Sequence, residues 1–120
     1  MTLSAMDFVA KAKETITEVD INAAKEALDS SLVLDVREPA EYAAGHLPGA
    51  FNIPRGLLEF KINSHPDFQD KQHANILVYC QTGGRSALAT ATLNQMGFDN
   101  AISLAGGYAA WAANNLDVIS

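Results

Sequence analysis

Hydrophobic and polar positions along this chain follow two alternating patterns. Short, continuous apolar runs occur at residues 32–34 and 76–79, a further strand is expected at 101–104, and a segment of helical composition follows each. Continuous apolar runs of this length favour strands that are covered on both faces, as in a parallel sheet. The alternation of strands and helices therefore predicts an α/β domain with a mainly parallel sheet.

The segments between the apolar runs predict helices and two further extended pieces. Helices are expected over residues 6–15, 21–28, 38–44, 56–62, 87–96 and 108–113, and short extended pieces over 16–19 and 50–53. Asp20 is a suitable N-cap for the second helix, and Pro39 and Gly45 suit the first position and the end of the third. Phe8 and Phe60 are expected to pack inward, and the polar stretch 63–75 to form a surface connection.

Length, composition and charge narrow the class of protein. A chain of 120 residues with 48% hydrophobic and 18% charged positions fits one globular domain. We expect residues 1–120 to form that domain, with 1–15 as a helical extension and 16–113 as the core. The formal net charge of −6 argues against nonspecific nucleic-acid binding and against an anionic membrane surface.

Cysteine usage and the N-terminus predict a location. One cysteine cannot form an internal disulfide, so a reducing compartment is the simpler assumption. Residues 1–16 hold charged positions and no apolar core of signal-peptide length, and no segment is long enough to span a membrane. We therefore expect a cytoplasmic protein.

The richest candidate for chemistry is the stretch around Cys80. The predicted strand 76–79 runs directly into this cysteine, and the loop residues Gln81, Thr82, Gly83, Gly84, Arg85 and Ser86 lead into a helix. Unpaired N–H groups and the helix dipole make a helix start attractive to anions, and a nearby Arg favours the nucleophilic thiolate. A lone cysteine after an apolar strand is more often an inert buried residue. The Gly-Gly-Arg-Ser sequence argues against that interpretation here.

Other chemistries fit the loop less well. A nucleotide-binding phosphate loop needs a Lys that is missing here. Cysteine phosphatases place five residues between Cys and Arg, whereas four separate Cys80 from Arg85, and the smaller ring suits one sulfur better than a phosphate. Ser86 lacks an ordered histidine partner and is expected to donate toward the cysteine sulfur or to cap the helix. The histidines show no metal-ligand spacing.

Charged residues elsewhere are expected to be structural. Asp35 and Arg37 lie two apart at the end of a strand, so their side chains start on the same face and can tie neighbouring loops together. Glu38, Glu41 and Glu59 are expected to be solvated helix residues. Two hypotheses fit Arg85. Its side chain contacts an anionic donor, or it pairs with a carboxylate while the backbone binds the substrate.

Taken in order, these residues resemble the single-domain rhodaneses, a family of sulfurtransferases. The resemblance covers roughly residues 16–113 and lies in LDVREP at 34–39, EY at 41–42, GHLPGA at 45–50, NIP at 52–54, YCQTGGRS at 79–86, MGF at 96–98 and LAGG at 104–107 with Trp111. It implies a five-stranded, mainly parallel sheet flanked by helices on both faces. It implies no cofactor and no metal.

The resemblance also implies a ping-pong reaction. Cys80 would take the outer sulfur of thiosulfate or of a persulfide donor, and a thiophilic acceptor, cyanide or a thiol, would remove it. The amides of residues 81–86 would stabilise the thiolate and the persulfide. With one cysteine, the acceptor must come from outside, as a small thiol or a partner protein.

One departure from the family pattern affects the expected donor. Some members carry basic residues inside the loop, whereas Gln81, Thr82, Gly83 and Gly84 are neutral. We therefore expect weak thiosulfate binding. Two alternative functions stay open: a phosphatase or arsenate reductase on the same scaffold, and a non-catalytic module that carries or senses sulfur.

Overall fold

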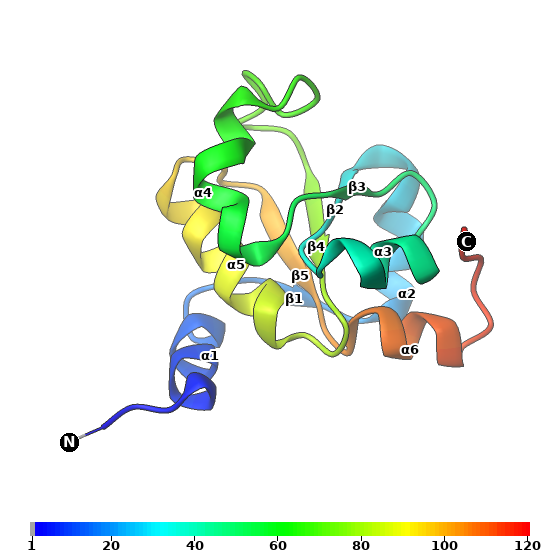
Figure 1. Cartoon of the computed structure of the whole chain (residues 1–120), viewed down its shortest axis with the longest axis horizontal. Helices are drawn as coiled ribbons and strands as arrows, with labels where there is room; N and C mark the ends of the chain where they lie inside the picture. Colours follow the sequence, from blue (N-terminus) through cyan, green and yellow to red (C-terminus); the bar gives the residue numbers. More distant parts are fainter. Residues whose placement is uncertain (1) are drawn as a thin grey trace.

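Five strands form one parallel sheet in the computed structural model, which describes residues 2–120; Met1 lies outside the described residues. The strands, in their order across the sheet, are β1 (Glu18–Val19), β5 (Ala101–Leu104), β4 (Ile76–Tyr79), β2 (Leu32–Asp35) and β3 (Phe51–Asn52). Every neighbouring pair is parallel. Helices cover both faces, as Figure 1 shows, so the predicted fold class is confirmed.

The central strands explain the continuous apolar runs. All four residues of β4 are buried. Ile76 and Val78 pack into one hydrophobic cluster, while Leu77 and Tyr79 pack into another on the opposite face. Successive side chains of a strand point to opposite faces, so a strand that is covered on both sides needs apolar residues at every position.

Two sets of helices cover the sheet. Figure 1 shows α1 (Ala5–Lys13), α4 (Leu58–Lys61) and α5 (Gly84–Gln95) on one side. On the other side lie α2 (Ile21–Ala27), α3 (Pro39–Ala44) and α6 (Gly107–Ala113). The predicted N-terminal extension is α1, which packs against α5 through Val9, Ala12 and Ala87.

Local sequence signals define several helix ends. The Asp20 side chain accepts a hydrogen bond of 2.9 Å from the N–H of Ala23, which confirms it as the N-cap of α2. Pro39 occupies the start of α3 and Gly45 its C-cap, as predicted. At the start of α3, Glu38 and Glu41 also form a capping box.

Two expected core aromatics are exposed instead. Phe8 is 51% exposed and Phe60 is 83% exposed. The helical segment around Phe60 is a single α-turn between the 3₁₀ turns Arg55–Leu57 and Ile62–Ser64. Its inward face is set by Leu58 and Ile62, which are four residues apart and fully buried, so Phe60 lies on the opposite side.

Two other boundaries differ from the sequence expectation. Helix α5 begins at Gly84, directly after the Cys80 loop, rather than at residue 87. The connection 63–75 is mostly exposed, but its Phe68 is fully buried and makes an edge-to-face contact with Phe51 at 5.6 Å. An isolated aromatic in a polar stretch can thus anchor a loop to the core.

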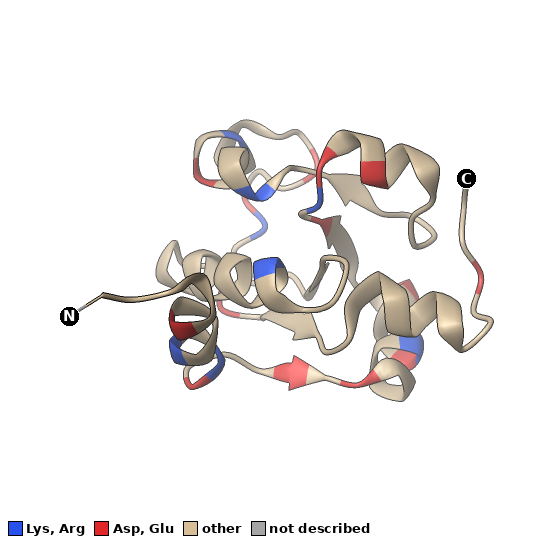
Figure 2. Cartoon of the chain, turned by 60° about the horizontal axis from the view of Figure 1, so that its bottom comes forward, with Lys and Arg blue, Asp and Glu red and all other residues tan. Residues whose placement is uncertain are grey.

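Charged residues are spread over the molecule. Figure 2 shows Lys and Arg positions distributed over several helices and loops, with Asp and Glu positions between them. Within residues 2–120, no helix combines the length and apolar character that crossing a bilayer requires.

Candidate active site

Cys80 lies at the carboxyl end of the central strand β4, where ligands collect in open parallel sheets. It is 1% exposed, and its loop leads directly into α5. Gly83 is the residue before the helix and has a φ of +114°, a backbone conformation that L side chains rarely adopt. This glycine therefore allows the chain to turn from the strand into the helix within three residues of the thiol.

The sulfur of Cys80 has two hydrogen-bond partners within the described residues. The Gly83 N–H donates to Sγ at 3.1 Å, and the thiol donates to Ser86 Oγ at 3.5 Å. Ser86 Oγ in turn donates to the Gly83 carbonyl at 3.2 Å and lies 2.9 Å from Ser103 Oγ on β5. Of the expected ring of amides, one N–H, that of Gly83, donates to the sulfur in this structure. The buried hydroxyls of Ser86 and Ser103 lie beside it.

The N-terminus of α6 holds the loop from the other side. The N–H groups of Tyr108 and Ala109 donate to the carbonyls of Cys80 and Gln81 at 2.8 and 3.0 Å. A Cβ on Gly107 would collide with the Cys80 carbonyl oxygen and would lie 2.8 Å from the Gln81 carbonyl carbon. Gly107 is therefore part of the site, a role that the sequence signalled only as a Gly-Gly pair before a helix.

Arg85 points to a carboxylate on another helix. Its Nη1 and Nη2 donate to the two oxygens of Glu41 at 2.7 and 3.1 Å. The expectation that Glu41 is a solvated helix residue is therefore wrong, because α3 and α5 meet at the carboxyl edge of the sheet. The Arg85 hydrogen bond lowers the pKa of Glu41 to about 2, and the same bond raises the pKa of Arg85.

Asp35 and Arg37 form a buried ion pair beside the loop. Arg37 Nη2 donates to Asp35 Oδ2 at 2.7 Å, and both side chains are at most 2% exposed. Arg37 also donates to the carbonyl of Gly45 at 2.6 Å and to the Gln81 side chain at 3.2 Å. Burial lowers the pKa of Arg37, but its hydrogen bonds with Asp35 more than offset this and the pKa is raised.

Tyr79 completes this network. Its hydroxyl donates to Asp35 Oδ2 at 2.7 Å and accepts from the N–H of Leu47 at 3.1 Å. Burial, together with the charge of Asp35, raises the pKa of Tyr79, so the phenol stays protonated. The guanidinium carbon of Arg37 lies 4.4 Å from the ring centroid of Tyr108. The network thus connects the ends of β2 and β4 to α6.

A cavity of about 310 Å³ adjoins the loop. Its walls are Arg37, Glu41, Ala44, Gly45, Gln81 and Tyr108. Of the predicted loop residues, Gln81 contributes a wall, Thr82 is exposed to solvent, and Gly84 is half-buried. The cavity therefore provides space for a small molecule next to the residue that follows Cys80.

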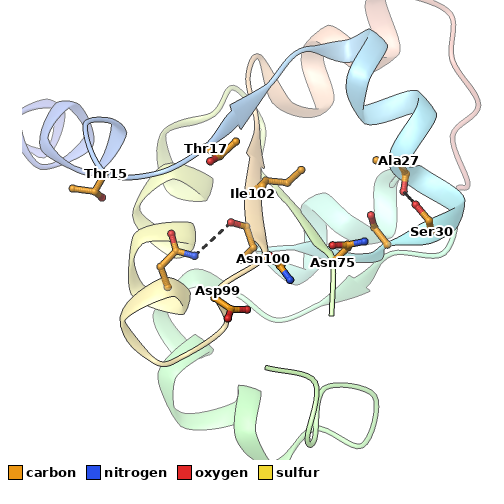
Figure 3. Close-up of a pocket in the computed structure, with 11 residues that line it drawn as sticks. Thr15, Thr17, Ala27, Ser30, Asn75, Asp99, Asn100 and Ile102 are labelled. Atoms are coloured by element: carbon orange, nitrogen blue, oxygen red, sulfur yellow. Dashed lines mark hydrogen bonds between the residues drawn. The ribbon is translucent and has the colours of Figure 1, made fainter. Parts of the chain in front are cut away.

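A larger cavity, of about 470 Å³, lies at the opposite edge of the sheet (Figure 3). Thr17, Asn75 and Asn100, which line it, each directly precede a strand, so the cavity faces the amino ends of the strands. Its lining residues carry no thiol and no basic group. Among residues 2–120, no group of three or more potential ligands is arranged for a metal ion. The thiol and the paired guanidinium groups of Arg37 and Arg85 lie instead at the Cys80 edge.

Comparison with known proteins identifies the family. Residues 19–114 match the family described as Rhodanese-like domain. The chain is 45% identical over 92 residues to thiosulfate sulfurtransferase 16 of Arabidopsis thaliana, covering 69% of this chain and 75% of that protein. It is 32% identical over 108 residues to a sulfurtransferase of Allochromatium vinosum, covering 88% of this chain and 96% of the relative.

A solved structure from Rhodopseudomonas palustris is also similar. It superposes with a TM-score of 0.86 at 29% identity, covers 99% of this chain and 96% of its own, and is described as a protein of unknown function and possible tyrosine phosphatase. The family match covers most of the present chain, and the curated relatives above are transferases that act on sulfur. The chain therefore belongs to the rhodanese-like family, and its relatives support sulfur transfer as its general activity.

Proposed function

We propose that this protein is a sulfurtransferase that carries a sulfane sulfur on Cys80 as a persulfide. The observation that supports this most directly is the hydrogen bond of 3.1 Å from the Gly83 N–H to the Cys80 sulfur, at the start of α5. An N–H that donates to sulfur favours negative charge there, and the thiolate is the nucleophilic form of cysteine. The family match supports the same chemistry.

The proposed first half-reaction conserves charge and electrons. The Cys80 thiolate attacks the outer sulfur of the donor, a new S–S bond forms, and the donor S–S bond breaks with its electron pair on the leaving group. From thiosulfate the leaving group is sulfite, and from an organic persulfide it is a thiolate. An external acceptor, cyanide or a thiol, then attacks the outer sulfur and releases the Cys80 thiolate.

The loop residues have distinct proposed roles. Gly83 stabilises charge on the inner sulfur through its N–H, and Ser86 lies 3.5 Å from that sulfur, where its hydroxyl can reverse and donate to the thiolate. Gln81, Thr82 and Gly84 shape the turn around the outer sulfur. Asp35 and Arg37 support the site because Arg37 binds the Gln81 side chain. Because Cys80 is 1% exposed, the loop must move before a donor can reach its sulfur.

The first test is the intact mass of the protein after treatment with thiosulfate or an organic persulfide. We expect the mass to rise by one sulfur atom in the wild type, to return to its starting value with cyanide, and to stay unchanged in Cys80→Ala. Absence of the added sulfur with both donors, or its persistence in Cys80→Ala, would contradict the proposal.

Steady-state kinetics extends this test to the physiological donor. We propose that thiosulfate binds weakly because the interior of the loop is neutral. A thiosulfate KM in the low-micromolar range would be inconsistent with this expectation. A persulfide that forms on Cys80 without multiple turnover would instead favour the sulfur-carrier alternative.

A phosphatase is the second candidate, because the similar Rhodopseudomonas palustris structure is described as a possible tyrosine phosphatase. The same preparations are assayed with an aryl phosphate and with arsenate. Cys80-dependent turnover of either compound, without transfer of sulfur, would favour a phosphatase or an arsenate reductase.

A further inference from the structure

The loop after Cys80 contains one cationic side chain, and a carboxylate of the same chain already forms an ion pair with it. Between residues 81 and 86 the basic residue is Arg85. Both of its terminal nitrogens donate to Glu41, one to each carboxylate oxygen, which is the two-point geometry of a strong Arg–carboxylate pair. An anionic donor must therefore displace Glu41 before it can bind Arg85 in the same way.

The second guanidinium near the site, that of Arg37, also donates its hydrogen bonds to groups of the protein. Arg37 directs its Nε and Nη2 to Asp35, its Nη2 also to the Gly45 carbonyl, and its Nη1 to Gln81. Arg37 and Glu41 both line the cavity of about 310 Å³ beside the loop. A ligand that enters this cavity thus meets the Arg37 guanidinium, whose nitrogens already donate to protein oxygens, and the Glu41 carboxylate, which is paired with Arg85.

We infer that Glu41 determines donor specificity: it weakens the binding of inorganic dianions and favours, in the adjoining cavity, sulfane donors that carry an organic group and at most one negative charge. This inference rests on the proposed function. The cavity is at the small end of the size range for ligand pockets, which suits a compact organic body. Glu41 carries its negative charge at neutral pH, and the Arg85 hydrogen bond lowers its pKa further, to about 2.

Two related donors test the inference. Thiosulfate is a dianion, whereas methanethiosulfonate is a monoanion with an organic group. With both donors, the Cys80 thiolate takes the outer sulfur as the S–S bond breaks; sulfite leaves from the first and methanesulfinate from the second. The donors therefore differ in charge and body but give the same Cys80 persulfide.

Glu41→Gln removes the charge and retains the local fold. Glutamine at the third position of a helix can still accept the capping hydrogen bond that Glu41 now accepts from the Glu38 N–H. Glu41→Gln leaves the Arg85 guanidinium without its carboxylate partner. Because the attraction of this cation for a ligand scales with ligand charge, we expect the thiosulfate KM to fall about tenfold and the methanethiosulfonate KM about threefold. A tenfold change corresponds to about 1.4 kcal/mol.

Two further variants control for charge and for the role of Arg85. Glu59→Gln makes the same charge change on α4, at a carboxylate that pairs with Arg55 of the preceding turn, and both KM values should stay within about twofold. In an Arg85→Gln background, adding Glu41→Gln should no longer produce the larger gain for thiosulfate. A gain that persists in this background would overturn the proposed route through Arg85.

The salt dependence of the two KM values gives a further measurement. Raising the ionic strength screens the repulsion of a dianion by Glu41 and by the net charge of −6, so the wild-type thiosulfate KM should fall relative to the methanethiosulfonate KM. This relative fall should be smaller in Glu41→Gln than in Glu59→Gln. A rise would indicate a free cation at the site and would overturn the inference. An unchanged thiosulfate KM in a folded Glu41→Gln protein that still forms the persulfide would also overturn it, leaving the proposed function intact. If neither donor adds sulfur to wild-type Cys80, the proposed function itself fails.

Discussion

Asp35 and Arg37 show how a buried charge pair can organise the loop and the cavity beside it. Asp35 is fully buried, yet its carboxylate accepts from the Arg37 guanidinium and from the Tyr79 hydroxyl at 2.7 Å in each case. Removing charges from water is costly, so the pair is tolerated only because its polar atoms are so completely bonded. The benefit is geometric: Arg37 connects the end of β2 to Gln81 in the loop.

Arg37→Met tests this role at the scale of one residue. The variant leaves Asp35 buried without its cation, and we expect the free energy of unfolding to fall by about 3–5 kcal/mol. Arg55→Met, which breaks the more exposed pair with Glu59, should cost about 1 kcal/mol or less. Denaturant unfolding followed by circular dichroism measures both losses. Equal losses would show that burial of the pair is not what makes Arg37 important.

At the scale of the elements, α6 holds the backbone of the loop at Cys80 and Gln81. Its first amides bind the carbonyls of Cys80 and Gln81, and this approach requires Gly107, where φ is +58° and a Cβ would overlap the loop backbone. The helix therefore holds the backbone that carries the thiol, while the N-cap and first turn of α5 supply the groups that contact the sulfur, Gly83 and Ser86.

Gly107→Ala tests this contribution of α6. Backbone strain and overlap together should lower the free energy of unfolding by about 2–4 kcal/mol and slow the formation of the Cys80 persulfide. Gly49→Ala is the matched control: φ at Gly49 is +77°, but no atom lies within 4 Å of its Cβ position. It should cost about 1 kcal/mol and leave persulfide formation unchanged. Identical behaviour of the two variants would contradict a specific role for Gly107.

For the molecule as a whole, the Glu41–Arg85 pair connects helices from opposite sides of the sheet. Helix α3 lies with α2 and α6 on one side, and α5 lies with α1 and α4 on the other (Figure 1). The ion pair therefore bridges the two layers at the carboxyl edge, next to Cys80. Because it is about one-third exposed, its contribution to stability is modest.

This bridge predicts a pH dependence of stability. The pKa of Glu41 falls from 4.5 to about 2 on folding, so its contribution is present above pH 4.5 and is lost as the pH falls toward 2. Wild type should exceed Glu41→Gln by about 0.5–1 kcal/mol at pH 7, and the difference should shrink toward zero near pH 2. Urea unfolding at several pH values measures this, with Glu26→Gln on α2 as the control. A difference that does not change with pH would contradict the prediction.

The sequence by itself determined the class of fold, the order of its elements and the position of the cysteine at the end of a central strand. These features rest on local signals: continuous apolar runs, the Asp20 cap, and the glycines that follow Cys80. Even so, the inward face of a short helix was misassigned at Phe60, because a single turn presents too few positions to define a face.

The tertiary structure alone decided which distant residues surround the sulfur. Glu41 and Arg85 are 44 positions apart, and Ser86 and Ser103 are 17 apart. Neither separation has a local signature, because these contacts exist only once the parallel strands have brought the ends of β2, β4 and β5 to one edge of the sheet. Whether a charge is solvated or paired depends on such contacts, so the sequence located the candidate nucleophile, whereas the folded chain determined the charges around it.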